Sequence, residues 1–433
     1  MKNITPFQLA ILAFFAVTGM VGIFFLATFQ TDPIPEEERI GVVSIWGTYD
    51  GRIINTWISR LKENNENLAD VSYKEFSTSD FDTEVLEALA EQRAPDLLLL
   101  DNTQVLEQYN RIIALDGNAI PVGYFRSTYL QMAEVYITPQ GILGVPLFAD
   151  PLVMFWNRTI FQSAGEVKPP VSWQDFFRII PLFTKKTDNL TITATTLPLG
   201  EAINVNNFKE IITTLVLQAG NPVITQVEQG FTSTLSGSLS FPSAFQAVQF
   251  FTEFSNPSSE VYSWNRSLPS SQDYFLAGKS ATYLGFASEI KPIQLKNPNL
   301  NFDVAEIPQS QTTGSKSVYA KLYGLFIPRQ AKNPTSSLRA MTVLSSQNAL
   351  EQLQDIVKLS VVRRDLASQT AGDDLFTDIF RREAIYAQTY LDPSDLLTNK
   401  IMGTLVETVT SGRRSIEDAI SLSDQEIQVL LNK

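Results

Sequence analysis

The stretch GVPLFADPLVMFWNRTIF, residues 144–161, decides how this chain is organised. It is an apolar run that the pair Asp150-Pro151 interrupts. Proline fixes its own φ angle and pushes the residue before it into extended geometry. We therefore predict a defined, extended connection at this pair, which continues neither a strand nor a helix. The plainer alternative is an ordinary strand–turn–strand unit inside one domain.

The length and composition set outer limits on the architecture. A chain of 433 residues exceeds what one compact core usually holds, so we expect two domains or two lobes. Hydrophobic residues make up 44% and charged residues 18%, as in ordered globular proteins. The formal net charge of -13 argues against a surface made for nucleic acid or anionic lipid. Neutral or cationic partners are favoured instead.

Two residue types are missing, and their absence removes whole classes of chemistry. The sequence has no cysteine, which excludes disulfides, thiolate nucleophiles and a lipid-modified cysteine. It also has no histidine, which excludes an imidazole base, a Ser-His-Asp triad and histidine-ligated metals. We expect no metal and no cofactor. Carboxylate-pair glycosidase chemistry and Ser-Lys catalysis pass this filter.

The amino terminus carries an uncharged stretch over residues 4–29 that is long enough to cross a bilayer. It exceeds a usual signal-peptide core, and no clear A-x-A site precedes the sequence TDPIPEEER. We predict that residues 1–30 are a retained transmembrane anchor, with a cleaved signal peptide as the alternative. Residues 31–39 are then an exposed tether. The position of Lys2 places the body of the protein outside the membrane, by the positive-inside tendency.

Strand-like runs at 40–47, 71–77 and 96–102 alternate with stretches of helical spacing. This alternation predicts a doubly wound α/β lobe, in which ligands meet the loops at the carboxyl ends of the strands. The residues that these loops offer are Trp46, Tyr49, Asp50, Ser77, Thr78, Asp101 and Asn102. For the short polar residues, the alternative is that they only cap the helices that follow.

Three further segments carry a resemblance to a known family. They are ILGVPLFADPLVMFWNRTIFQSAG with the following KPPVSWQDFF, then YFLAGKSATYLGFASEI at 274–290, and YGLFIPRQAKNPTSSLRAMTVLSSQ at 323–347. Their order and spacing, over about residues 40 to 350, resemble the extracellular solute-binding proteins of ABC importers. The similar branch is family 1, which includes maltose-binding protein.

The resemblance implies a type II periplasmic-binding-protein-like fold, with two doubly wound lobes joined by hinge crossovers. Asp150-Pro151 would be the first crossover. The implied first lobe comprises 40–149 and 311–355, and the implied second lobe 150–310 and 356–433. The implied protein is a cell-membrane-anchored, extracellular, monomeric receptor that hands a small solute to an ABC permease and is no enzyme. The alternatives are an anchored sensor or scaffold without a permease, and a carboxylate-dependent glycosidase that uses Asp50, Asp101, Asp150 or Glu289.

The aromatic residues favour a carbohydrate as the solute, because planar side chains stack on the apolar faces of sugar rings. The candidate platforms are Trp46, Tyr49, Trp156, Trp264, Phe286 and Tyr323. We expect Trp264 to be exposed because its loop is polar, and Trp46 and Phe286 to face each other across the cleft. Asp150 completes the predicted binding set. An amino-acid or peptide ligand would instead need a fixed cation, and Arg52, Arg126 and Arg158 are available.

Overall fold

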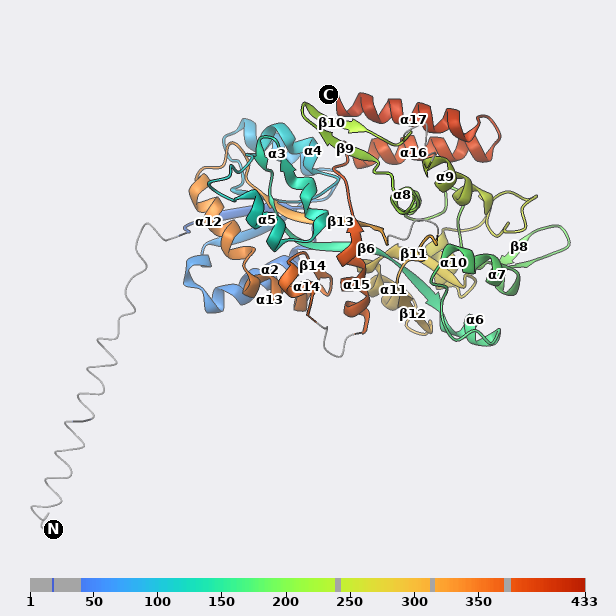
Figure 1. The fold of residues 1–433 in the computed structure, drawn as a ribbon. Coiled ribbons are helices and arrows are strands. Elements are labelled where there is room, and N and C mark those ends of the chain that lie inside the picture. Colours follow the sequence, from blue (N-terminus) through green and yellow to red (C-terminus); the bar gives the residue numbers. More distant parts are fainter. Residues whose placement is uncertain (1–17, 19–39, 238–242, 312–315, 370–374, 433) are drawn as a thin grey trace, which may run out of the picture.

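The structure is a computed structural model that describes residues 18, 40–237, 243–311, 316–369 and 375–432. Two lobes stand side by side and are joined by long strands (Figure 1). Apart from Thr18, the predicted anchor at 1–30 and the tether at 31–39 lie outside the described residues. Within the described ranges, no helix is both long enough and apolar enough to span a bilayer.

The first lobe is built on parallel strands, as the alternating pattern predicts. Strand β1 (Val43–Gly47) lies between β2 (Val71–Glu75) and β3 (Leu97–Asp101) and runs parallel to both. All five residues of β3 are buried. This is expected for a strand with four consecutive leucines in a sheet that is covered on both faces. On its other side β3 pairs antiparallel with β13 (Val318–Phe326), which enters this lobe from a distant part of the sequence.

Helix α2 (Gly51–Asn64) shows how later parts of the chain return to the first lobe. Its buried face includes Trp57, whose indole N–H donates a 2.8 Å hydrogen bond to the carbonyl oxygen of Ala349. Ala349 belongs to helix α13 (Gln347–Val357), which packs against α2. The segment at 323–347 and its sequel therefore lie against β3 and α2.

Strand β6 (Val145–Asn157) is the connection that the opening motif predicts, and all 13 of its residues are buried. Its first half pairs with β13 and with β14 (Ser360–Val361), and its second half pairs with β11 (Thr282–Phe286) and β12 (Phe302–Ala305). The extended geometry of Asp150-Pro151 is confirmed, but the prediction that the pair interrupts the strand is wrong. A proline is tolerated there because the partners of β6 change at this point: Pro151 is the last residue of β6 to pair with β13, opposite Ala320, and the pairing with β11 begins at Leu152.

The second lobe departs from the doubly wound pattern predicted for it. Both β11 and β12 run antiparallel to β6. The order of the main sheet is β11-β6-β13-β3-β1-β2, so one sheet passes through both lobes (Figure 1). The parallel strand–helix repeat is a property of the first lobe, and the shared strand β6 sets the pairing in the second.

Helices surround the second-lobe strands. Helix α7 (Trp173–Phe183) begins with a capping box between Ser172 and Asp175. Helix α8 (Phe208–Gln218) is buried along its whole length because α9 (Ser243–Glu253), β13 and α16 (Asp395–Thr410) contact it. Helix α17 (Ile416–Leu431) packs on α16 and α9 at the end of the chain (Figure 1).

The carboxyl-terminal third divides between the lobes later than the sequence indicates. Strand β14 pairs with Phe148 and Ala149 of β6, and α14 (Arg364–Ala367) contacts α5 (Val122–Thr128). Residues 360–367 thus lie with first-lobe elements, beyond the predicted boundary at 355/356. A two-residue strand has too little periodicity to be recognised in a sequence.

The remaining described elements are short connections and covering helices. They are α3 (Phe81–Ala90), α4 (Val105–Gln108), α6 (Arg158–Ser163), α10 (Ser271–Leu276), α11 (Ile290–Lys296), α12 (Pro334–Leu344), α15 (Leu375–Tyr386), β4 (Ile137–Thr138), β5 (Gly141–Ile142), β7 (Lys185–Lys186), β8 (Ile192–Ala194), β9 (Ile224–Val227), β10 (Gly230–Ser233), β15 (Ala387–Gln388), and the 3-10 turns η2 (Glu66–Leu68), η3 (Tyr109–Arg111), η4 (Gln131–Tyr136) and η5 (Ala287–Glu289).

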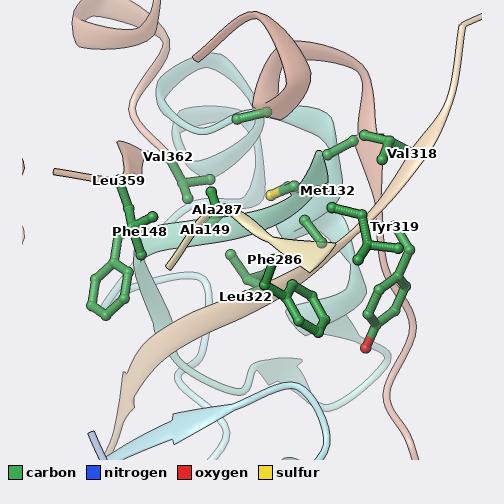
Figure 2. Packing of buried hydrophobic residues seen from close by; sticks show 14 of the residues in the cluster. Met132, Phe148, Ala149, Phe286, Ala287, Val318, Tyr319, Leu322, Leu359 and Val362 are labelled. Atoms are coloured by element: carbon green, nitrogen blue, oxygen red, sulfur yellow. The ribbon is translucent and has the colours of Figure 1, made fainter. Parts of the chain in front are cut away.

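The hydrophobic core is continuous from one lobe to the other. Figure 2 shows the part of it around β6 and β13, where Phe148 of the first-lobe half of β6 and Phe286 at the end of β11 belong to one cluster with Leu322. Because apolar burial contributes about 25 cal/mol per Å², this shared core stabilises the join between the lobes. The cleft described next lies beside this join.

Candidate functional site

Two neighbouring cavities lie between the lobes, and together we call them the cleft. The larger has a volume of about 650 Å³ and the smaller about 360 Å³. Both are lined by Lys321, Asp395 and Asn399, so they meet along these three residues. A cleft of this size accommodates a small organic solute.

The first-lobe wall of the cleft comes from the loops at the carboxyl ends of β1, β2 and β3, as the parallel sheet predicts. Four of the predicted binding residues line the larger cavity: Tyr49, Thr78, Asp101 and Tyr323. Others in this wall were not predicted and add hydroxyl, amide and carboxylate groups, namely Thr48, Ser79, Asp82, Thr103, Gln104 and Glu107. The signal for them was weak, because they occupy positions that helix caps also favour.

Aromatic rings form part of this wall. The ring centroid of Tyr49 lies 5.1 Å from that of Tyr323, and Tyr323 is stacked on Phe148 at 4.6 Å. Burial, reinforced by Asp150 and Asp50, raises the pKa of Tyr49 well above its usual range. Both phenols are therefore neutral at physiological pH and offer a hydroxyl beside an apolar ring face.

Asp101 is held in a fixed orientation at the end of β3. Its Oδ1 accepts hydrogen bonds from the backbone N–H and the hydroxyl of Thr103, at 2.8 and 2.5 Å. Its Oδ2 accepts no hydrogen bond from any of the described residues. The carboxylate therefore retains an acceptor oxygen on a residue that lines the larger cavity.

The second-lobe wall is organised by Glu289, which lies beneath it. Its carboxylate accepts hydrogen bonds from the Phe286 backbone N–H at 2.8 Å, Asn207 Nδ2 at 2.8 Å, the Tyr283 hydroxyl at 2.5 Å and Gln272 Nε2 at 2.7 Å. Phe286 and Asn207 both line the smaller cavity, so Glu289 positions this wall. The sequence placed Glu289 among candidate catalytic acids, but four donors occupy its oxygens.

Gly285 serves this packing rather than the approach of a ligand to the backbone. A Cβ atom there would lie 2.6 Å from Tyr283 Cε1 and 2.9 Å from Glu289 Oε1. A side chain at this position would therefore displace the carboxylate that holds the wall together.

A buried lysine ties the start of α16 to α8 at the base of the cleft. Lys209 Nζ donates to Asp392 at 2.9 Å and to the Thr398 hydroxyl at 3.2 Å, and it also contacts Asp395. Burial alone lowers the pKa of Lys209, but Tyr390, Asp392 and other acidic neighbours outweigh it and hold the pKa above its usual range. No prediction from the sequence included this cluster. The available signal was one lysine in the apolar helical run FKEIITTLVLQ, which indicates a buried ion pair.

The predicted exposure of Trp264 is wrong. Its side chain is 0% exposed, and its indole N–H donates to Asn204 Oδ1 at 2.9 Å. The polar residues of its loop are satisfied by contacts of this kind, so a polar sequence there does not mean an exposed tryptophan. Trp156 is also core, with its ring 5.2 Å from that of Phe161.

Trp46 lies outside the lining of both cavities and so does not face Phe286 across the cleft. Its ring centroid is 4.7 Å from that of Phe76, and Lys74 Nζ lies 5.1 Å from it. Trp46 is on β1 itself, two residues before the loop reaches the cavity at Thr48, which explains its different environment.

Two further predicted residues have structural contacts instead of a place in the cleft. Asn102 is fully buried, donates to the Tyr319 hydroxyl and the Tyr390 carbonyl, and accepts from the Leu322 N–H. Ser77 donates to Asp80 at 2.8 Å, just before α3. The hydrogen bonds of Asn102 therefore link β3 to β13 and to the chain that leads to α16.

The remaining predicted acids also have defined roles. Asp50 is the N-cap of α2 and pairs with Arg52, so the capping alternative is confirmed for it. Asp150 is buried in β6, and its Oδ1 accepts a 3.0 Å hydrogen bond from the backbone N–H of Ser288. Burial raises the pKa of Asp150 to about 6, against the opposing effects of Ser288 and Lys321.

The arginines considered for an anionic ligand are paired outside the cleft. Arg52, Arg126 and Arg158 form ion pairs with Asp50, Glu134 and Asp303, respectively. The described lining of the two cavities contains no arginine. The cleft thus lacks the bidentate cation that a carboxylate ligand favours.

The fold has close counterparts among solved structures. It matches a cyclo/maltodextrin-binding protein complexed with maltotetraose at a TM-score of 0.70 and 14% identity, over 92% of this chain and 98% of that one. It matches the cyclic alpha-maltosyl-1,6-maltose binding protein from Arthrobacter globiformis at 0.72 and 15%, over 90% and 98%. It matches the sugar-binding protein MalE from Xanthomonas citri at 0.70 and 16%, over 90% and 97%.

The search of curated protein sequences finds no match. The sequence does match the family model described as bacterial extracellular solute-binding protein, over residues 53–347. That range begins in α2, includes the strands β6 and β13, and ends at the start of α13. It therefore covers the walls of the cleft, except for the loop after β1 and the start of α16. Sequence and fold agree, and the chain belongs to the bacterial extracellular solute-binding protein family.

Proposed function

We propose that this protein captures a neutral saccharide in the cleft between its lobes and delivers it to an ABC permease. The observation that carries the proposal is the composition of the cleft. Tyr49 and Tyr323 offer ring faces on one wall and Phe286 lies in the other. Hydroxyl and amide groups surround them, including Thr78 and Asn207, and these suit the hydroxyls of a sugar.

The solved structures support this choice of ligand class. One of them is complexed with maltotetraose, another is a cyclic alpha-maltosyl-1,6-maltose binding protein, and the similar GacH receptor of Streptomyces glaucescens is complexed with acarbose. At 14 to 17% identity the similarity establishes the fold, and the transfer of a sugar ligand to this chain is part of our proposal.

An enzymatic role has little support from the acids that it would use. Asp50 caps a helix, Asp150 accepts a backbone hydrogen bond, and Glu289 accepts from four donors. Membership in a solute-binding family also supports a non-enzymatic role. We therefore propose binding and delivery without chemical change to the solute.

We further propose that residues 1–30 anchor the protein in the cell membrane, with the body on the outer side. The support is the uncharged stretch at 4–29 and the absence of cysteine, which excludes a lipid anchor. Full-length protein should remain with the membrane fraction in carbonate buffer, and a variant that lacks residues 1–30 should not. Release of the full-length chain would contradict the anchor.

The proposed ligand class is tested by titration calorimetry of the full-length protein against maltotriose, mannotriose, tagatose, leucine, a tripeptide and spermidine. We expect binding of at least one sugar and of none of the other solutes. The Tyr323→Ala variant should weaken that binding by roughly tenfold or more, as loss of an aromatic contact in a binding site does. Tyr262→Ala, outside both cavities, is the control.

Binding confined to the peptide or the amine would contradict the saccharide proposal. Delivery is a separate question, answered by co-purification of a permease with the cross-linked, full-length protein. If sugar binds but no permease is recovered, the anchored sensor or scaffold becomes the better interpretation.

A further inference from the structure

Lys321 occupies an unusual position at the junction of the two cavities. It lies in β13, directly opposite Asp150 of β6, and lines both cavities. Its Nζ lies 5.0 Å from the ring centroid of Phe286, which belongs to the second-lobe wall. One ammonium group therefore faces both parts of the cleft.

The charge on Lys321 is maintained by acids from four separate elements. Burial alone lowers the pKa of Lys321, but Asp101, Glu210, Asp395 and Asp150 raise it on balance. Asp101 ends β3, Glu210 is in α8, Asp395 begins α16 and Asp150 is in β6. We call these four carboxylates the acidic ring.

The ammonium group has no ion-pair or hydrogen-bond partner in the part of the chain that the structure describes. None of the four carboxylates of the acidic ring lies within the 4.0 Å that defines an ion pair, and Nζ of Lys321 donates no hydrogen bond to a described residue. Lys209, by contrast, contacts Asp392 and Asp395 directly. Lys321 thus holds three N–H donors at the edge of two cavities.

This arrangement suits one kind of ligand atom. A hydroxyl group accepts one hydrogen bond and donates another, so it can join an ammonium to a carboxylate that is too far away for direct contact. Two hydrogen bonds in succession span about 4 to 5.5 Å. Adjacent hydroxyls of a polyol repeat this bridge, whereas a carboxylate or phosphate would meet more negative charge than positive.

We propose that Lys321 is a further ligand-binding residue of the cleft, which donates to hydroxyls that in turn donate to Asp101, Glu210 or Asp395, and that the acidic ring restricts the site to non-anionic polyols. This inference rests on the proposed saccharide function and adds the residue and the charge class that would select the sugar.

The test compares Lys321→Met with wild type, both as the full-length protein, by titration calorimetry with maltotriose, mannotriose and trigalacturonic acid. Methionine keeps the length of the apolar stem and removes the donors. The matched control is Lys279→Met, because Lys279 also lies over an aromatic ring, 5.8 Å from Tyr274, but outside both cavities. Apo melting temperatures of all variants are measured in parallel.

We expect a neutral trisaccharide to bind wild type and Lys279→Met equally, and Lys321→Met about tenfold or more weakly, which corresponds to the loss of one charge-assisted hydrogen bond. Trigalacturonic acid should bind none of them. The apo melting temperature of Lys321→Met should fall no further than that of Lys279→Met, because each variant loses one contact between an ammonium group and an aromatic ring. If Lys321→Met fails to fold, Glu210→Gln tests the acidic ring and should weaken the same sugar.

Each outcome bears on a different statement. Equal binding of a neutral sugar by wild type and Lys321→Met overturns the role of Lys321 and leaves the saccharide function intact. Tight binding of trigalacturonic acid by wild type overturns the charge selection. If leucine, the tripeptide or spermidine binds and no sugar does, the proposed function fails and this inference fails with it. Absence of binding by any of these solutes likewise counts against both.

Discussion

Replacement of Asp150 by asparagine should make the protein more stable at neutral pH. The side chain is 3% exposed, and burial raises its pKa from the ordinary value of 3.8 to about 6. At pH 7 the folded protein must therefore carry a buried carboxylate that the unfolded chain would expose to water. Asparagine has the same shape, and its Oδ1 can still accept the hydrogen bond from the Ser288 N–H, which is 3.0 Å long in the wild type.

The sign and size of the effect follow from proton linkage. Below pH 3.8 both states of Asp150 are protonated, and the carboxyl group contributes no pH dependence. Between pH 3.8 and about 6 the unfolded chain loses this proton while the folded protein retains it, so stability declines as the pH rises. The difference between the two pKa values corresponds to about 3 kcal/mol, which is lost in full above pH 6.

Urea unfolding followed by tryptophan fluorescence at pH 4, 5, 6 and 7 measures this decline. The stability of Asp150→Asn relative to wild type should increase across the series by up to about 3 kcal/mol. Asp188→Asn, at an exposed position, is the control and should show no trend. A difference that stays constant from pH 4 to 7, or that shrinks, would show that burial does not govern Asp150.

Three other substitutions test separate parts of the structure. Lys209→Met should cost about 3 to 5 kcal/mol in urea unfolding, because it leaves Asp392 buried without its cation, and the double variant with Asp392→Asn should recover part of this loss. Trp57→Phe should cost about 1 to 3 kcal/mol, because it leaves the carbonyl of Ala349 without a donor; an unchanged urea midpoint would contradict this. Trp46→Ala should lower the melting temperature, by a loss of about 1 to 3 kcal/mol, and leave the affinity for any bound sugar unchanged, so weaker binding without destabilisation would restore Trp46 to the site.

The first lobe was predictable because its signals are local. Four consecutive leucines predict a buried parallel strand at 96–102. The spacing of Ile54, Trp57 and Ile58 predicts the helix that the structure shows as α2. The loops that follow such strands meet at one edge, which placed Tyr49, Thr78 and Asp101 at the cleft. The pairing of the second lobe was not predictable in this way, because antiparallel neighbours of β6 come from residues more than 100 positions away.

Within the site, the errors concern side chains whose role depends on distant partners. Trp264 is buried because Asn204, 60 residues away in sequence, accepts its N–H. Asn102 has a structural role because Tyr319 and Tyr390 lie beside it in space and accept its hydrogen bonds. A polar residue after a strand indicates where a ligand could bind, but only the packed structure shows whether another part of the chain already occupies that side chain.

Strands β6 and β13 connect the two lobes beside the cleft. Asp150 and Lys321 lie opposite each other in these strands, and the carboxylate of Asp150 accepts from Ser288, next to the Phe286 wall. A rotation of the second lobe about this join would shift Ser288 relative to Asp150 and Phe286 relative to Lys321 at the same time. The residues at the join between the lobes are thus neighbours of those proposed to hold the solute, so a ligand that bridges Lys321 to both walls would favour one relative position of the lobes over others.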